Sequence, residues 1–445
     1  MFNTIRNAFK VPELRKRIWF TLLLMIVFRF GAHIPVPFLS KEAMSAFLGN
    51  GTDLFSLFNV FTGGAFANAT VMALGVSPYI NASIIMQLLA VAIPALERLA
   101  KEGLEGRKKL NKITRYVGIA LAFVQGAGLY VTLHNMGVAN PELGEIIRNE
   151  SVLTFFVITL TFTAGTAFIV WLGELITEKG VGNGVSLIIF AGIISSIPSG
   201  IMTVYNQFLA DGVRTIGNII LALVVLIIAI LAIVLVVFFD SAERRIPVQY
   251  AKRVVGRKMY GGQSTNIPIK VVMGGVMPII FASSIMAFPA TIVRLATSGN
   301  LPTTGIWFRV LGCMTAGYGP GWTDIVYAVL YFLLIIFFTY FYSAIQFNPI
   351  EMANNMKKSG GYIPGYRPGK PTSDYIAKVS QRLNLSGAIF LGIIAVLPVV
   401  IGAVFGVKGL QIGGTSLLIM EGVALETVRQ IESQMVMRNY KGFLE

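Results

Sequence analysis

The chain has 445 residues, of which 55% are hydrophobic and only 13% are charged, and its formal net charge is +15. Soluble domains carry about a quarter charged residues, so this composition excludes a soluble protein and indicates one whose solvent is lipid. One cysteine and two histidines allow neither an intrachain disulfide nor a histidine-rich metal site. We therefore expect no metal, no cofactor and no redox chemistry.

Ten segments are candidates for membrane-spanning helices, because about 20 apolar residues cross a hydrocarbon core of roughly 30 Å. Six of them are long and strongly apolar: residues 116–136, 151–173, 215–239, 271–293, 325–347 and 383–407. Four are weaker: one begins at Ile18 and contains Arg29, one lies within 71–96, one runs from 184 to about 205, and one follows Gly413 and carries Glu421 and Glu426.

The distribution of lysine and arginine predicts the orientation, because cytoplasmic loops retain these residues. With the amino terminus inside, 29 of the 36 basic residues fall in the cytoplasmic segments 1–17, 97–115, 174–183, 240–270, 348–382 and 429–445. Ten spans with both termini in the cytoplasm fit this alternation. Nine spans would place Arg429, Arg438 and Lys441 outside.

Two of the basic loops are longer than topology requires. In residues 240–270, Ile246, Val248 and Tyr250 alternate before a basic tip, which predicts a β-hairpin that projects from the membrane. Residues 348–382 are rich in turn formers around Arg367. Projecting basic loops suit a polyanionic partner such as ribosomal RNA, whereas the alternative is a solvated loop without a partner.

A short sequence recurs at an offset of 200 residues. Residues 75–85 (GVSPYINASII) match residues 275–285 (GVMPIIFASSI) at seven of eleven positions, including a glycine and a proline. Chance likeness of apolar helices is the alternative, but a shared proline implies shared helix geometry. The copies lie in the second and seventh spans, so the second copy enters the bilayer in the opposite direction, as in inverted-repeat transport proteins.

Residues 54–96 contain no ionisable side chain, yet residues 54–70 mix asparagine, threonine and glycine with phenylalanine and make a poor span. Irregular backbone is tolerated at membrane depth only inside protein or beside a water-filled cavity. We expect a short re-entrant segment in the middle of the bundle. The alternative is an interfacial loop on the outer leaflet.

The spans offer little for coupled transport or catalysis. Arg29, His33 and Glu421 are the ionisable groups expected inside the membrane, and none has an obvious partner in the sequence. No HExxH motif, Ser-His pair or carboxylate pair suggests a hydrolase, so we expect no enzyme activity. A ring of branched aliphatic side chains would instead close a pore by dewetting, which favours a large and non-specific substrate.

Several motifs together resemble the bacterial SecY family, the channel subunit of the Sec protein translocase, over essentially the whole chain. They are residues 28–37 (FRFGAHIPVP), 75–89, 171–174 with 182–184, 263–265, 281–284, 357–360 with 367–369, and 413–418. The resemblance implies an all-α polytopic membrane protein with ten transmembrane helices in two inverted five-helix halves around a central pore. The halves would be residues 1–205 and 206–445.

The resemblance also implies four groups of functional residues. The pore ring would be Val76, Ile80, Val185, Ile189, Ile280 and Ile419, with valine at two positions where better-known members have isoleucine. The plug would be residues 54–70, with Phe55, Phe58, Phe61, Gly63, Gly64 and Phe66. The lateral gate would include Asn81, Gln87, Ser283, Ser284 and Phe288, and the cytoplasmic partner contacts would be Arg257, Lys258, Lys357, Lys358 and Arg367.

The implied function is to pass unfolded secretory polypeptides across the bacterial cytoplasmic membrane and to release membrane segments laterally into lipid. The implied partners are the SecE and SecG subunits, the SecA ATPase, the ribosome and its RNA, signal peptides, nascent polypeptides and membrane lipid. A secondary transporter or flippase with an inverted-repeat fold is the second hypothesis. It requires polar groups that bind substrate at the midplane, and the aliphatic ring argues against them.

Overall fold

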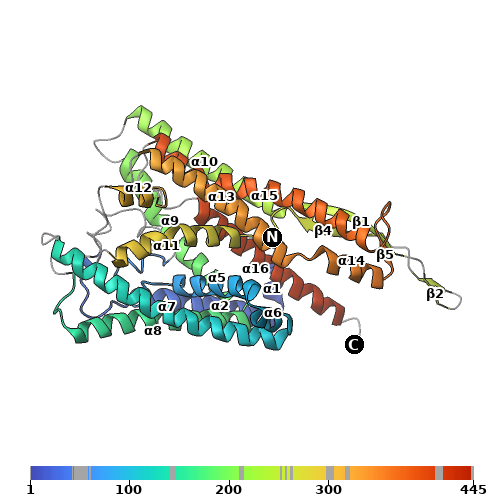
Figure 1. Cartoon of the computed structure of the whole chain (residues 1–445), viewed down its shortest axis with the longest axis horizontal. Coiled ribbons are helices and arrows are strands. Elements are labelled where there is room, and N and C mark those ends of the chain that lie inside the picture. Colours follow the sequence, from blue (N-terminus) through green and yellow to red (C-terminus); the bar gives the residue numbers. More distant parts are fainter. Residues whose placement is uncertain are drawn as a thin grey trace.

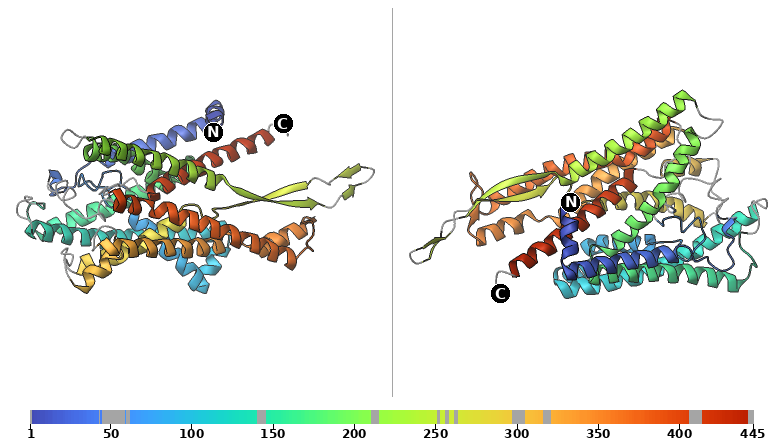
Figure 2. Two further views of the ribbon diagram at one scale, coloured as in Figure 1. Left: turned by 90° about the horizontal axis from the view of Figure 1, so that it is seen from above. Right: turned by 180° about the vertical axis from the view of Figure 1, so that it is seen from behind.

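The computed structural model describes residues 2–42, 44, 59, 62–139, 146–209, 215–250, 253–255, 258–260, 264–296, 305–315, 321–405 and 414–441. These form a bundle of long helices with a small β-structure at one end (Figures 1 and 2). The helices of the first half are α1 (Phe2–Lys10), α2 (Pro12–Gly31), α5 (Ser77–Ala92), α6 (Pro94–Lys101), α7 (Leu104–Ala139), α8 (Val152–Lys179) and α9 (Gly184–Phe208). Those of the second half are α10 (Ile216–Ser241), α11 (Met277–Ala296), α12 (Ile306–Gly312), α13 (Gly321–Gln346), α14 (Pro349–Lys358), α15 (Lys370–Phe405) and α16 (Gly414–Lys441).

Each of the ten segments expected to span the membrane contains a helix. In the described part of the chain, stretches long and apolar enough to cross a membrane occur in α7, α8, α9, α10, α13 and α15, and the bent pair α5 and α6 is a seventh candidate. Helices α2 and α16 carry several charges, and the apolar stretch of α11 is short. The helical, polytopic architecture is confirmed, while the number ten stays a prediction.

The chain turns sharply between α5 and α6. The two helix axes differ by 107°, and Ile93 between them has extended backbone angles. A residue before proline is biased away from the helical conformation, and Pro94 follows Ile93. Helix α6 is amphipathic and carries Glu97, Arg98 and Lys101. Its sequence therefore suits the membrane surface rather than the hydrocarbon core.

Most helices of the two sequence halves lie on opposite sides of the bundle, with α2, α5, α7 and α8 below and α10, α11, α13 and α15 above in Figure 1, while α9 and α16 pack against each other between them. Each half has its own hydrophobic core. The rings of Phe239 and Phe390, from α10 and α15, stack with centroids 3.9 Å apart. Ile84 of α5 belongs to the core cluster of the second half, and Ile419 of α16 belongs to a cluster of the first half. These two helices thus join the halves.

The predicted hairpin in residues 240–270 is confirmed. Strand β1 (Glu243–Tyr250) pairs antiparallel with β4 (Ser264–Lys270), and β2 (Arg253–Val255) and β3 (Lys258–Tyr260) form a second antiparallel pair. Ile246 and Val248 are buried, as their alternation predicts. The short strand β5 (Gly361–Tyr362) adds to β1, giving the order β4-β1-β5. The two long basic loops therefore share one sheet, which the sequence did not indicate.

The basic segments gather at one end of the bundle. In Figure 1 the sheet, α14, α6 and the end of α16 lie toward the right, and α12 lies at the left. The left panel of Figure 2 shows the hairpin extending beyond the helix ends. This arrangement is the one that the distribution of lysine and arginine predicts.

Helices α8 and α9 approach closely at Gly184, which leads to a test of the packing. A Cβ atom at Gly184 would overlap the Gly173 carbonyl oxygen and lie 2.8 Å from the Ile176 Cβ. We expect Gly184→Ala to lower the stability by about 1–3 kcal/mol, because backbone atoms must move apart.

The matched control is Gly217→Ala in α10, where an added Cβ meets nothing within 4 Å. Alanine there gains helix propensity, so the melting temperature should stay the same or rise. Melting of the purified protein in detergent, followed by the fluorescence of its four tryptophans, measures both variants. Equal melting temperatures for the two variants would contradict the close approach.

Candidate functional site at the centre of the bundle

The duplicated sequence forms a duplicated backbone. Gly75 and Gly275 both have φ of 56°, a left-handed conformation that glycine adopts without steric cost. Helices α5 and α11 begin two residues later, at Ser77 and Met277. The following prolines occupy the first helical turn, where no backbone N–H is required. The offset of 200 residues is thus a repeat of local structure as well as of sequence.

The six residues of the expected pore ring lie together in one hydrophobic cluster. They come from the start of α5 and from α9, α11 and α16. Val76, Ile189 and Ile419 are buried, and the other three pack against the same cluster at partial exposure. None of these side chains can donate or accept a hydrogen bond. The four helices therefore bring together six side chains that offer water no polar partner.

The irregular segment 62–70 satisfies much of its backbone internally. The Gly64 N–H donates to the Asn59 carbonyl at 2.8 Å, and the Ala67 N–H donates to the Asn59 side-chain oxygen at 2.9 Å. The buried Thr70 hydroxyl donates to the Ala65 carbonyl at 3.0 Å. Such bonds let a non-helical backbone lie inside a membrane protein. Phe55, Phe58 and Phe61 of the expected plug lie outside the described residues, as does most of 54–61.

This segment is also tied to the chain that follows α2. The Val36 N–H donates to the Ala69 carbonyl at 2.9 Å, and the Val71 N–H donates to the Ile34 carbonyl at 3.0 Å. Phe66 is buried in a cluster with residues of α7 and α8. The expected plug residues Gly63, Gly64 and Phe66 are therefore held within the first half of the bundle.

The sequence offered no partner for Arg29, and the structure provides one. Its guanidinium donates to the carbonyl oxygen of Gly63. A backbone carbonyl leaves no mark in the amino-acid sequence, because every residue has one. The contact could be found only from the fold.

The expected gate residues lie on α5 and α11. Asn81, Gln87, Ser283 and Ser284 are partly buried, and Phe288 is 60% exposed. The Gln87 amide donates to the Ser83 hydroxyl at 3.2 Å, and the Ser283 hydroxyl donates to the Ile280 carbonyl at 3.0 Å. Each of these two bonds stays within its own helix, so neither would have to break if the helices separated.

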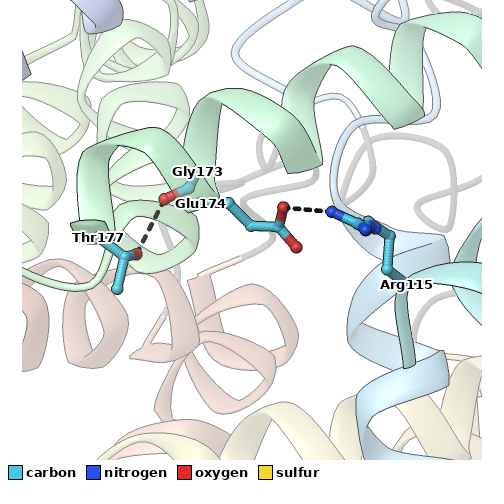
Figure 3. A network of polar contacts seen from close by, with 4 residues as sticks. All are labelled: Arg115, Gly173, Glu174 and Thr177. Atoms are coloured by element: carbon cyan, nitrogen blue, oxygen red, sulfur yellow. Dashed lines mark hydrogen bonds and ion pairs between the residues drawn. The ribbon is translucent and has the colours of Figure 1, made fainter. Parts of the chain in front are cut away.

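Figure 3 shows a polar link between α7 and α8. Arg115 Nη1 and Glu174 Oε2 are 2.8 Å apart, and both side chains are about one-third exposed. The Thr177 hydroxyl donates to the Gly173 carbonyl and accepts from the Gly184 N–H, each at 2.9 Å. Glu174 lies in a motif noted above, but Arg115 is 59 residues away along the chain and its role was missed.

The expected partner contacts that the structure describes lie at the end of the bundle that carries the sheet. Lys357 and Lys358 are exposed in the last turn of α14. Arg367 is exposed too, and its carbonyl accepts a 2.8 Å bond from the Thr372 hydroxyl. Lys258 begins β3, and Arg257 lies outside the described residues. The structure therefore brings the loops of these residues to one end of the molecule.

Comparisons with known proteins agree with this geometry. The SecY family model matches residues 70–428. The chain is 45% identical to the protein translocase subunits SecY of Streptomyces coelicolor and Mycobacterium tuberculosis, and 46% identical to that of Halalkalibacterium halodurans. Each alignment covers the whole of both chains.

Solved structures support the fold. One described as the structure of a protein conducting channel aligns with a TM-score of 0.65 at 19% identity, covering 94% of this chain and 92% of the other. Sec61 in the canine ribosome-channel complex aligns with a TM-score of 0.62 at 18% identity, over the same shares of the two chains. A family match over most of the sequence and full-length relatives at this identity lead to one conclusion: the chain belongs to the SecY family of protein translocase subunits.

Proposed function

We propose that this chain is a protein-conducting channel that passes unfolded polypeptides between its two halves. The observation that carries the proposal is the convergence of the aliphatic side chains Val76, Ile80, Val185, Ile189, Ile280 and Ile419 in one hydrophobic cluster. Hydrophobic constrictions close by dewetting and give an ion no ligand. Because such a ring recognises no chemical group, it suits a polypeptide of arbitrary sequence. In this proposal residues 1–205 and 206–445 are the inverted halves that flank the pore.

The plug and the gate complete the proposed channel. Residues 54–70 would fill the pore at rest, and α5 and α11 would separate to release apolar segments into lipid. Support comes from the irregular backbone of 62–70, which lies inside the bundle, and from the gate hydrogen bonds, which stay within each helix. Asn81, Ser284 and Phe288 would lie along the edges of the opening.

The proposed channel is not catalytic, so partners must supply the energy of transport. The relatives are named as subunits, and one structural neighbour is a Sec61 complex with a ribosome. We propose SecE and SecG as companion subunits, and SecA or the ribosome as the partner at the basic end. Exposed Lys357, Lys358 and Arg367, with Arg257 and Lys258 at the hairpin, would make that contact.

The proposed location is the bacterial cytoplasmic membrane, with both termini in the cytoplasm. The multi-pass helical fold and the bacterial relatives support this location. The basic segments at the end of the bundle that carries the sheet would then face the cytoplasm.

Site-specific photocrosslinking tests the proposed pathway. A photoreactive residue at Ile80 or Ile280 should capture a stalled secretory chain, because both side chains belong to the ring. The matched control is Leu226 of α10, which is 58% exposed on the outside of the bundle. Crosslinks at Leu226 as strong as those at the ring, or none at the ring, would favour the small-substrate transporter instead.

The seal can be tested at Ile189, whose side chain is 6% exposed. Ile189→Asn should raise the resting ion conductance in planar bilayers, since a buried amide gives water a partner in the constriction. Ile189→Val is the control: it keeps the surface dry and costs only about 0.5–1.5 kcal/mol of stability. Conductance that is equal in the two variants would argue against a dry seal at this position.

Charge reversal tests the proposed contact at Arg367. We expect Arg367→Glu to slow SecA- or ribosome-dependent export at least several-fold, because an acidic side chain repels a polyanionic partner. The control is Arg107→Glu, an equal charge change at an exposed position of α7 outside the two loops. Export rates of the two variants are compared at equal expression. Normal export with Arg367→Glu would refute the assignment of Arg367 as a partner contact.

A further inference from the structure

Arg29 places a cation near the end of α2, in a segment that the sequence assigns to the membrane. A charged side chain at membrane depth is costly and is retained when it has a partner and a function. Here the guanidinium donates to the Gly63 carbonyl, which lies 34 residues further along the chain. The contact joins a long helix to the irregular segment 62–70.

A second helix reaches the same carbonyl oxygen. The Ser195 hydroxyl of α9 lies 3.4 Å from the Gly63 oxygen and 2.8 Å from the Gly192 oxygen. A hydroxyl has one hydrogen, so it is shared between these two acceptors. The Gly63 carbonyl is thus contacted from two helices, α2 and α9.

The backbone around Gly63 is shaped for this contact. Gly63 has φ of 64° and is buried. A Cβ atom there would lie 3.0 Å from both the Arg29 Nη1 atom and the Gly192 Cα atom. A side chain at this position would push the turn away from both helices. Glycine therefore allows the Gly63 carbonyl to approach Arg29 and Ser195.

We propose that Arg29 and Ser195 form a latch that holds the segment 62–70 in its resting position. Hydrogen bonds to a charged donor are stronger than neutral ones, so Arg29 carries the larger share. Elsewhere the segment is held by bonds to residues 34–36 after α2 and by the packing of Phe66 against α7 and α8. Release of Gly63 from both Arg29 and Ser195 would therefore free the start of the segment. The inference rests on the proposed function, since it assigns the latch to the plug.

The test measures how often the segment opens in the resting complex. The single cysteine, Cys313, is replaced by serine, and Ala67, which is partly buried, is replaced by cysteine. The reconstituted complex, without any polypeptide substrate, is treated on both sides with a membrane-impermeant maleimide. The labelling rate and the resting ion conductance are measured together with the melting temperature.

Arg29→Met, which keeps an unbranched apolar stem but removes all donors, should raise the labelling rate roughly tenfold or more, with a parallel rise in conductance. Arg29→Lys should give an intermediate rate, because an ammonium still donates. Ser195→Ala should raise the rate about twofold, since its bond is long and shared. The control is Arg309→Met, which removes an exposed guanidinium from α12 and should change neither rate nor conductance.

An unchanged labelling rate in Arg29→Met and Ser195→Ala overturns the latch. A lower melting temperature with unchanged labelling and conductance also overturns it, because that result means a structural role only. If Arg29→Met does not accumulate in membranes, the labelling rate and the resting conductance of Arg29→Lys and Ser195→Ala test the latch instead. Failure of the latch leaves polypeptide capture at Ile80 and Ile280 intact, whereas failure of the proposed function abolishes that capture even when Arg29→Met opens the segment.

Discussion

The lack of water inside a bilayer is the constraint on which this structure depends. Every backbone N–H and C=O at membrane depth needs a partner within the protein, and long helices meet that need by themselves. The segment 62–70 is not helical, and it meets the need with side chains: the Asn59 amide, the Thr70 hydroxyl and the Arg29 guanidinium each bind a backbone group. Such bonds are what allow an irregular backbone to lie at membrane depth.

The same constraint explains why the proposed ring residues are all aliphatic. Water enters a narrow space only where it finds hydrogen-bonding partners, and the six aliphatic side chains of the proposed ring, among them Ile189 and Ile419, offer none. The cluster draws on both halves of the chain, because α16 of the second half packs against α9 of the first half. Its integrity therefore depends on how the halves sit against each other.

Much of the fold could be predicted from the sequence, because the signals are local. Apolar runs marked the helices, the alternation of Ile246 and Val248 marked a strand, and the repeat at Gly75 and Gly275 marked equal turns. The proposed ring could not be identified from such local signals. Val185 and Ile189 look like any aliphatic residues of a membrane helix, and only the family resemblance singled them out.

Contacts between distant segments could not be predicted, because no local pattern in the sequence shows which partners pair. The Gly63 carbonyl, the pairing of β5 with β1 and the ion pair of Arg115 with Glu174 all depend on tertiary placement. Each joins segments whose separation along the chain says nothing about their distance in space.

The shared sheet has a mechanical consequence. Strand β1 follows directly from α10, β4 leads into α11, and β5 precedes α15. Hydrogen bonds across β4-β1-β5 join these three connections in one sheet, and the buried face of this sheet packs in its own hydrophobic cluster. A displacement of either loop would therefore be passed through the sheet to the connections of three helices of the second half, α10, α11 and α15.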